Sequence, residues 1–155
     1  MKFSAQEEYG LRCLLSLARE GRDGFLTIPL IAKREGLTPS HVAKLLSILR
    51  QNGFIKSTRG QAGGYALNME IEKIEVAKVL ESLGGRMYGP GFCERHSGIL
   101  ENCVHETDCI LRPLWSKIQG SVDGALDGLT IADILSWKAC EGNVTFVGAR
   151  QQVTA

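Results

Sequence analysis

The chain has 155 residues, 44% of them hydrophobic and 23% charged, which is typical of one or two small globular domains with a real core. No apolar run approaches the ~20 residues that a membrane-spanning helix needs, and the start of the chain has no apolar signal segment. The sequence therefore predicts a cytoplasmic protein without a membrane span. In a reducing cytoplasm, its five cysteines indicate metal or redox chemistry rather than a disulfide framework.

The net charge of +1 hides an uneven distribution of charge along the chain. Residues 33–59 contain six basic residues and one acidic residue, whereas residues 93–133 contain seven acidic residues and three basic ones. A basic segment of this kind is typical of a binding site for a polyanion. A solvated surface is the alternative interpretation of the same pattern.

Three helices are expected before residue 54. Ser4 can cap the first, with Glu7 at the capping-box position. The second, IPLIAKRE, ends at Gly36, and the third is expected to open at Ser40 and to end at Asn52-Gly53. Two short helices joined by a tight turn that contains glycine predict a helix-turn-helix.

A β-hairpin is expected directly after these helices. The β-prone runs FIKST and YAL flank a glycine-rich turn, and a helix-turn-helix followed by a hairpin is a winged helix. Its third helix would enter the major groove of DNA, and a generic helical domain is the alternative. We expect bases to be reached by Ser40 and His41, phosphates by Lys44, Arg50 and Arg59, and the backbone or minor groove by the wing residues Arg59 and Gln61.

Three more helical segments follow the wing. IEKIEVAKVLESLGG predicts an amphipathic helix, residues 113–128 a long helix, and TIADIL at 130–135 a short capped one. A long apolar-faced helix outside the main core is a candidate dimerisation helix, because helix-turn-helix proteins usually bind palindromes as symmetric dimers. The expected fold class is mainly α with a small β-hairpin wing: a winged helix-turn-helix plus a long C-terminal dimerisation helix.

Three cysteines, Cys93, Cys103 and Cys109, lie in the acidic segment with the spacing C-x9-C-x5-C. Structural zinc sites prefer a C-x2-4-C pair, which this loop lacks. Wide spacing suits a larger object such as an iron–sulfur cluster, although a zinc site, a thiol switch and inert thiols are alternatives on spacing alone. A fourth ligand would be needed, and the loop itself offers His96, His105, Glu106 and Asp108.

The sequence resembles the IscR/NsrR-type (Rrf2 superfamily) winged-helix iron–sulfur transcriptional regulators over roughly residues 1–136. The wing motif RG-x-x-GGY-x-L, here RGQAGGYAL, is its most specific feature, and the first helix and the three-cysteine loop before Leu114-Trp115 also match. The resemblance implies a cytoplasmic homodimer that binds an operator and carries an iron–sulfur cluster near the dimer interface.

The resemblance also implies where the fourth ligand lies. Members with a histidine ligand place it where this chain has Arg112, which cannot bind a metal. Other members use a carboxylate from the first helix of the opposite subunit, where this chain has Glu8. The neighbouring Glu7 lies ~100° around the helix, and an exposed acid favoured by the helix dipole is the alternative role for Glu8. Three thiolates with one carboxylate resemble the ligand set of the nitric-oxide-sensing members, and this resemblance slightly favours a [4Fe–4S] cluster over a [2Fe–2S] cluster.

The expected function is that of a DNA-binding transcriptional regulator whose affinity for a palindromic operator is controlled by a cluster that senses redox state, nitric oxide or iron and cluster supply. A cluster-free repressor, controlled by thiol oxidation or by a partner protein, is the alternative. The sequence shows no nucleophile–base pair and no phosphate-binding loop, so we do not expect an enzyme. We divide the chain into a winged-helix DNA-binding domain (1–84), a cluster-binding loop (85–112), dimerisation helices (113–136) and a flexible tail (137–155).

Overall fold

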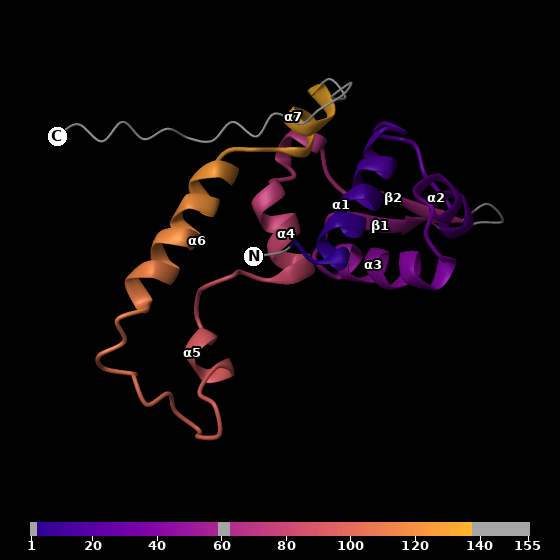
Figure 1. Cartoon of the computed structure of the whole chain (residues 1–155). Helices are drawn as coiled ribbons and strands as arrows, with labels where there is room; N and C mark the ends of the chain where they lie inside the picture. The colour runs from indigo at the N-terminus through magenta and orange to yellow at the C-terminus, as the bar shows by residue number, and fades with distance from the viewer. Residues whose placement is uncertain (1–2, 59–62, 138–155) are drawn as a thin grey trace.

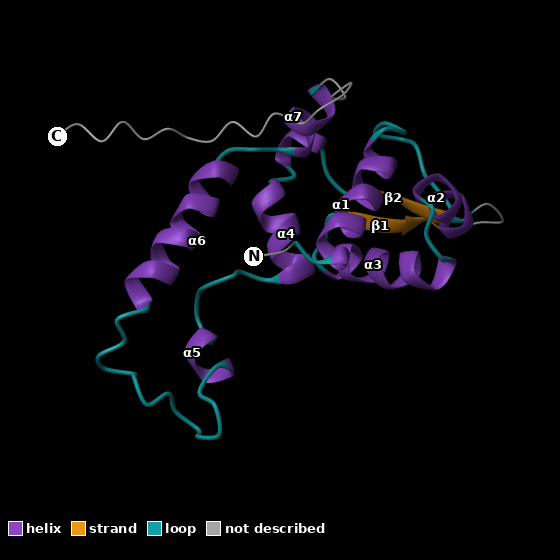
Figure 2. Cartoon of the chain, in the orientation of Figure 1, coloured by secondary structure: helices purple, strands orange, loops and turns teal. Residues whose placement is uncertain are grey.

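The computed structural model describes residues 3–58 and 63–137, and its fold is mainly α with a two-stranded antiparallel hairpin, as expected (Figures 1 and 2). The expected tail falls outside the described residues except for Trp137. In chain order the elements are α1 (Ala5–Ala18), α2 (Ile28–Glu35), α3 (Pro39–Gln51), β1 (Ile55–Thr58), β2 (Gly64–Leu67), the 3-10 helix η1 (Ile71–Lys73), α4 (Val76–Gly84), α5 (Phe92–Arg95), α6 (Arg112–Leu126) and α7 (Ile131–Ser136).

Local capping sets the ends of the first three helices. The Ser4 hydroxyl accepts a hydrogen bond from the Glu7 N–H, and the Glu7 carboxylate accepts one from the Ser4 N–H, which confirms the expected capping box. Gly36 ends α2 in the left-handed conformation, with a φ of +67°. The expected start of α3 at Ser40 was wrong, because the hydroxyl of Thr38 caps the helix and the preset φ of Pro39 suits its first turn.

The hydrophobic core lies where α1 packs against α3 and α4. Cys13 on α1 is fully buried there, and so are Leu45, Leu46 and Leu49 of α3. Burying a leucine side chain of this kind stabilises a fold by about 1.5–3 kcal/mol. The amphipathic pattern of α3 therefore fixes which of its faces points inward and which points toward solvent.

A close approach of two helices brings the start of α1 onto the end of α4. A Cβ atom at Gly10 would overlap the side chain of Leu83, so the glycine lets the two backbones come together. The Gln6 amide donates a hydrogen bond to the Leu83 carbonyl, which lies in the last turn of α4. These contacts fix the position of the N-terminal turns of α1, where Glu8 lies.

The wing is anchored by a third segment of chain. β1 pairs with β2 in the register Ile55↔Leu67, and Leu26 exchanges two backbone hydrogen bonds of 2.9 Å with Tyr65 of β2. A Cβ atom at Gly64 would lie 2.5 Å from the Leu26 carbonyl oxygen, which explains a glycine in the wing motif. The turn at residues 59–62, with Arg59 and Gln61, lies outside the described residues.

The chain after α6 returns to the winged-helix body. The Val76 N–H donates to the Leu129 carbonyl and the Ile131 N–H donates to the Ile74 carbonyl, each at 2.9 Å. Because residues 74–75 are extended to make this pairing, the helix expected after the wing is divided into η1 and α4. The Ile131 side chain is fully buried in the core, so α7 packs with the winged-helix body while α6 stands at its edge (Figure 1).

The cysteine loop extends from the body between α4 and α6 and includes the single turn α5 (Figure 1). Among helices of the described ranges, none combines the length and the apolar character required to cross a bilayer.

We expect Gly64→Ala to lower the free energy of unfolding by about 1–3 kcal/mol, because the added methyl group must displace the backbone at Leu26. Gly120→Ala is the matched control, since a Cβ atom at that position of α6 meets open space, and alanine is the better helix former by about 1 kcal/mol. Urea unfolding followed by circular dichroism measures both effects. Equal stability of the two variants would contradict the proposed contact.

Candidate nucleic-acid interface and cysteine site

One face of α3 forms an exposed ridge of polar residues. Ser40, Lys44 and Gln51 are exposed and Ser47 is half-buried, and the spacing of these four residues places them on one side of the helix. The opposite side carries the buried Val42, Leu45, Leu46 and Leu49. The structure thus places Ser40 and Lys44 on the exposed side, as expected for residues that face DNA.

Two residues of this ridge were missing from the sequence analysis. Ser47 and Gln51 continue the line of Ser40 and Lys44, and the Gln51 amide lies 3.5 Å from the Ser47 hydroxyl. The signal that could have found them is the helical period itself, because the ridge is the complement of the buried leucine stripe.

His41 and Arg50 lie on the flanks of α3. His41 is half-buried, and its ring packs edge-on against the Tyr9 ring of α1, with centroids 5.6 Å apart and an interplanar angle of 84°. His41, which the sequence assigns to base contacts, is thus only partly open to solvent, because α1 covers part of this side of α3. Arg50, assigned to a phosphate, is exposed.

An ionic contact ties α1 to the end of α2 beneath this interface. The Arg12 guanidinium donates to the Glu35 carboxylate at 2.9 Å and to the Glu35 carbonyl at 2.6 Å, and the Ser16 hydroxyl donates to the same carboxylate. The hydrogen bond that Arg12 donates to the Glu35 carboxylate raises the pKa of Arg12, and burial raises the pKa of the neighbouring Cys13 thiol to about 11. Cys13 is thus a protonated core residue, and the helix-turn-helix is held in place by α1.

The two acidic residues at the start of α1 differ in their surroundings. Glu7 is committed to the capping box with Ser4, and its side chain fills the space above Gly84 of α4. Glu8 is exposed, and its charge contributes to the raised pKa of Arg12 one turn later. Of the two carboxylates, Glu8 is the one that a second molecule can reach.

The three loop cysteines are half-buried free thiols, and each begins a turn. The carbonyl groups of Cys93, Cys103 and Cys109 accept hydrogen bonds from the N–H groups three residues later, at 3.1, 3.1 and 3.3 Å. In residues 3–58 and 63–137, no three metal-binding side chains come together. The donor set is that of an iron–sulfur site, but the thiols are not gathered around one point in this structure.

Aromatic packing braces the first cysteine against α6. Phe92, next to Cys93, stacks on the His96 ring with centroids 4.2 Å apart and lies 6.3 Å from the Trp115 ring. His96 Nδ1 also lies 2.7 Å from the Phe92 carbonyl oxygen. His96, one of the four loop residues considered as fourth ligands, therefore takes part in the aromatic stack. Two others pair with each other, because His105 Nδ1 lies 3.6 Å from the Asp108 carboxylate.

Arg112 has a structural role in the loop. Its guanidinium donates a hydrogen bond of 2.6 Å to the Glu106 carbonyl, which ties the start of α6 to the segment between the second and third cysteines. Arg112, which stands where the resemblance implies a histidine ligand in some members, therefore stabilises the loop through its backbone.

Comparison with known proteins identifies the family. The family model described as "Rrf2: Iron-dependent Transcriptional regulator" matches residues 3–136. The protein rrf2 of Nitratidesulfovibrio vulgaris is 32% identical, with 87% of each chain covered, and the HTH-type transcriptional regulator IscR of Aliivibrio salmonicida is 26% identical over all of this chain and 87% of its own length.

Two solved structures share the fold closely. IscR of T. potens has a TM-score of 0.68 and 28% identity, covering 87% of this chain and 86% of its own. CymR, the global cysteine regulator of B. subtilis, has a TM-score of 0.70 and 29% identity, covering 90% of this chain and 99% of its own. These relatives are transcriptional regulators rather than enzymes. The chain belongs to the Rrf2 family of winged-helix transcriptional regulators.

Proposed function

We propose that this regulator is a cytoplasmic homodimer that binds a palindromic operator, and that an iron–sulfur cluster on its cysteine loop controls operator affinity. The observation that carries the proposal is the placement of three half-buried free thiols on a loop that projects from a DNA-binding winged helix. Relatives named IscR support the cluster, because they share the fold and most of the chain length.

The exposed ridge of α3 is the proposed major-groove surface. Ser40, Ser47 and Gln51 would face bases, and Lys44 and Arg50 would bind phosphates beside them. We keep His41 as a base contact at the edge of this surface, since part of its ring is accessible. Arg59 and Gln61 on the wing complete the proposed set.

The apolar surface around α6 supports a dimer. Ile110, Leu111 and Leu114 are 89%, 49% and 48% exposed at the beginning of this helix, although each carries a large apolar side chain. A second copy of the chain that packs there would remove this surface from water. The symmetric arrangement would present two α3 helices to adjacent major grooves, ~34 Å apart.

Cys93, Cys103 and Cys109 would hold the cluster, preferably [4Fe–4S], and Glu8 of the partner subunit would supply the fourth ligand. When bound, such a cluster supplies iron sites that react with oxidants or nitric oxide. A carboxylate is a harder and weaker ligand for iron than a thiolate, so Glu8 would be released first. Because Glu8 lies on α1, and α1 packs on α3 and α4, release of Glu8 from the cluster would alter the placement of the two α3 helices of the dimer.

A cluster-free thiol sensor is the second candidate. One support is that the three thiols do not come together in the described structure. The other is the similarity to CymR: the structure of the oxidized form of Staphylococcus aureus CymR is 25% identical, with a TM-score of 0.68.

We expect Lys44→Gln to weaken DNA binding and to reduce the slope of log affinity against log salt by about 1, because one phosphate contact is lost. Lys117→Gln, an exposed change on α6, is the control and should leave the slope unchanged. Fluorescence anisotropy with an operator selected from random duplex DNA measures both. A slope equal to that of wild type would remove Lys44 from the interface.

We expect the anaerobically reconstituted protein to be brown and to carry one cluster per chain in native mass spectra, which also separate two irons from four. Cys103→Ser should abolish the cluster, whereas Cys13→Ala should retain it, because Cys13 is buried in the core. Glu8→Gln should retain it but lose it faster in air. A colourless wild-type protein with five free thiols per chain would instead support the thiol sensor.

A further inference from the structure

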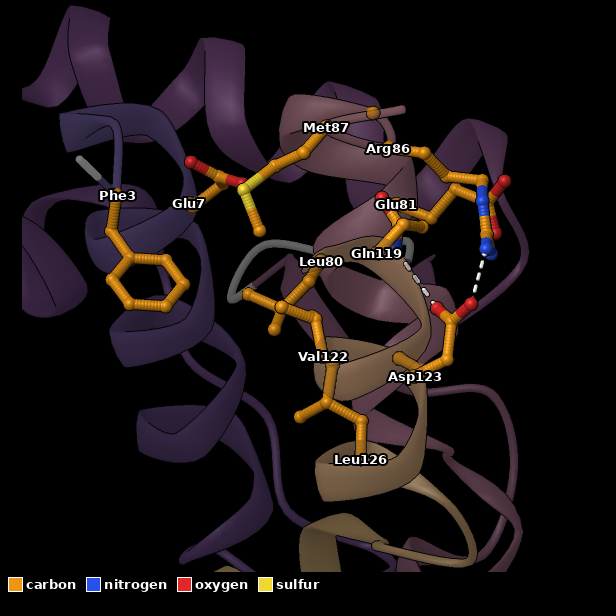
Figure 3. A pocket seen from close by; sticks show the side chains of 12 residues that line it. Phe3, Glu7, Leu80, Glu81, Arg86, Met87, Gln119, Val122, Asp123 and Leu126 are labelled. Carbon is orange, nitrogen blue, oxygen red and sulfur yellow. Dashed lines mark hydrogen bonds and ion pairs between the residues drawn. The ribbon is translucent and has the colours of Figure 1, made fainter. Parts of the chain in front are cut away.

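Four residues join the two ends of the cysteine loop, and we call them the clasp: Arg86, Tyr88, Gln119 and Asp123. The Gln119 side chain accepts a hydrogen bond from the Tyr88 N–H at 3.0 Å and donates one to the Asp123 carboxylate at 2.9 Å. The Arg86 guanidinium donates to the other oxygen of Asp123 at 2.5 Å. Figure 3 shows the chain of contacts from Arg86 through Asp123 to Gln119.

Gln119 is the central member of the clasp. Only 7% of its surface is exposed, whereas the other residues of α6 are exposed or half-buried. It lies beside a cavity of about 140 Å³ whose apolar wall includes Leu80, Val122 and Leu126 (Figure 3). A hydrogen bond in such surroundings is less exposed to competing water, and a buried amide left without partners costs about 1–3 kcal/mol.

The ion pair at the edge of the clasp is the weaker link. Arg86 and Asp123 have side chains that are 38% and 46% exposed, and exposed pairs of this kind contribute little to stability. The hydrogen bond from Gln119, followed by Arg86, lowers the pKa of Asp123, so its carboxylate is ionised at neutral pH and accepts both hydrogen bonds.

The clasp closes a long loop. Tyr88 and Gln119 are 31 positions apart, and Cys93, Cys103 and Cys109 all lie between them. Bringing three thiolates onto one metal centre requires the ends of this loop to stay together, and closing a loop costs conformational entropy. Because the clasp already holds the two ends together, metal binding does not have to meet this entropic cost again. We propose that the clasp, with Gln119 at its centre, is a positioning device that holds the cysteine loop ready to bind a thiophilic metal centre.

This inference rests on the proposed function, because it assigns a metal centre to the three thiols. Its test therefore uses Cd²⁺ alone, which reports whether the thiolates can converge without requiring assembly of a cluster. The full chain with Cys140→Ser provides the background, so that the loop supplies the three accessible thiols of the described structure, Cys13 being buried. Thiolate-to-Cd²⁺ absorption in the ultraviolet, under competition from a chelator, measures affinity.

We expect Gln119→Leu to weaken Cd²⁺ binding about 10-fold, as is typical for loss of an outer residue that orients metal ligands. Arg86→Gln should weaken it less. Ser121→Ala is the matched control on the same helix, because the Ser121 hydroxyl bonds only to the Lys117 carbonyl of its own helix among the described contacts, and this variant should bind like wild type.

An exchange of groups separates positioning from general instability. Gln119→Glu alone places a second carboxylate beside Asp123 and should weaken binding. In the double variant Gln119→Glu with Asp123→Asn, the carboxylate at 119 accepts from Tyr88 N–H and from the amide at 123, whose oxygen accepts from Arg86. The double variant should recover affinity to within about 3-fold of wild type, since every hydrogen bond of the clasp is remade.

The outcomes distinguish the two proposals. Weak binding by Gln119→Leu together with recovery in the double variant supports the clasp, even if anaerobic reconstitution yields no iron–sulfur cluster, which would count against the proposed function alone. Equal Cd²⁺ affinity for Gln119→Leu, Ser121→Ala and wild type would overturn the clasp and leave the cluster proposal standing. Failure of the double variant to recover would also overturn it.

Discussion

The close packing of α1 against α3 and α4 is the constraint on which the rest of the molecule depends. Gly10 allows the backbone of α1 to approach α4 at Leu83, and Arg12 holds Glu35 at the end of α2. One helix thereby fixes both the helix-turn-helix and the end of α4 from which the cysteine loop departs. A movement of α1 must reach both, because close-packed interiors transmit displacement instead of absorbing it.

The attachment of α6 joins the cysteine loop to the winged-helix body. Its C-terminal end is held by backbone pairing with residues 74–76 and by the buried Ile131, and its middle is held by Gln119 and Asp123. The beginning of α6, with Leu111 and Leu114, has large apolar side chains exposed to solvent. α6 therefore has two fixed points and one uncovered apolar end.

The relatives include regulators named IscR and CymR, the latter described as a global cysteine regulator, and the cysteine loop is the part of the chain in which the two proposed modes of control differ. The thiols of Cys93, Cys103 and Cys109 are free and half-buried, each at the first position of a turn. Arg112 ties the loop through the Glu106 carbonyl, and the aromatic stack of Phe92 on His96 braces it beside Cys93, so neither contact uses a cysteine sulfur atom. The loop is braced in this way without the thiols in contact, so the proposed cluster requires them to converge when it binds.

Features that depend on a few neighbouring residues were determined by the sequence itself. The capping box at Ser4, the glycine that ends α2, the buried leucines of α3 and the capped helix after Thr130 all follow from local patterns, because helix termini and periodicity are short-range properties. The same applies to the spacing of the three cysteines, and the family resemblance predicted from these motifs is confirmed.

Only the tertiary structure decided the features that join distant parts of the chain. The break between η1 and α4, the burial of Ile131 and the contact of His41 with Tyr9 depend on segments that meet across the fold. Gln119 looked like an ordinary polar residue of an amphipathic helix, and its role is set by a backbone N–H 31 positions away. Local propensity carries no information about such a partner, because the free energy of the contact exists only after the chain between the two residues has closed.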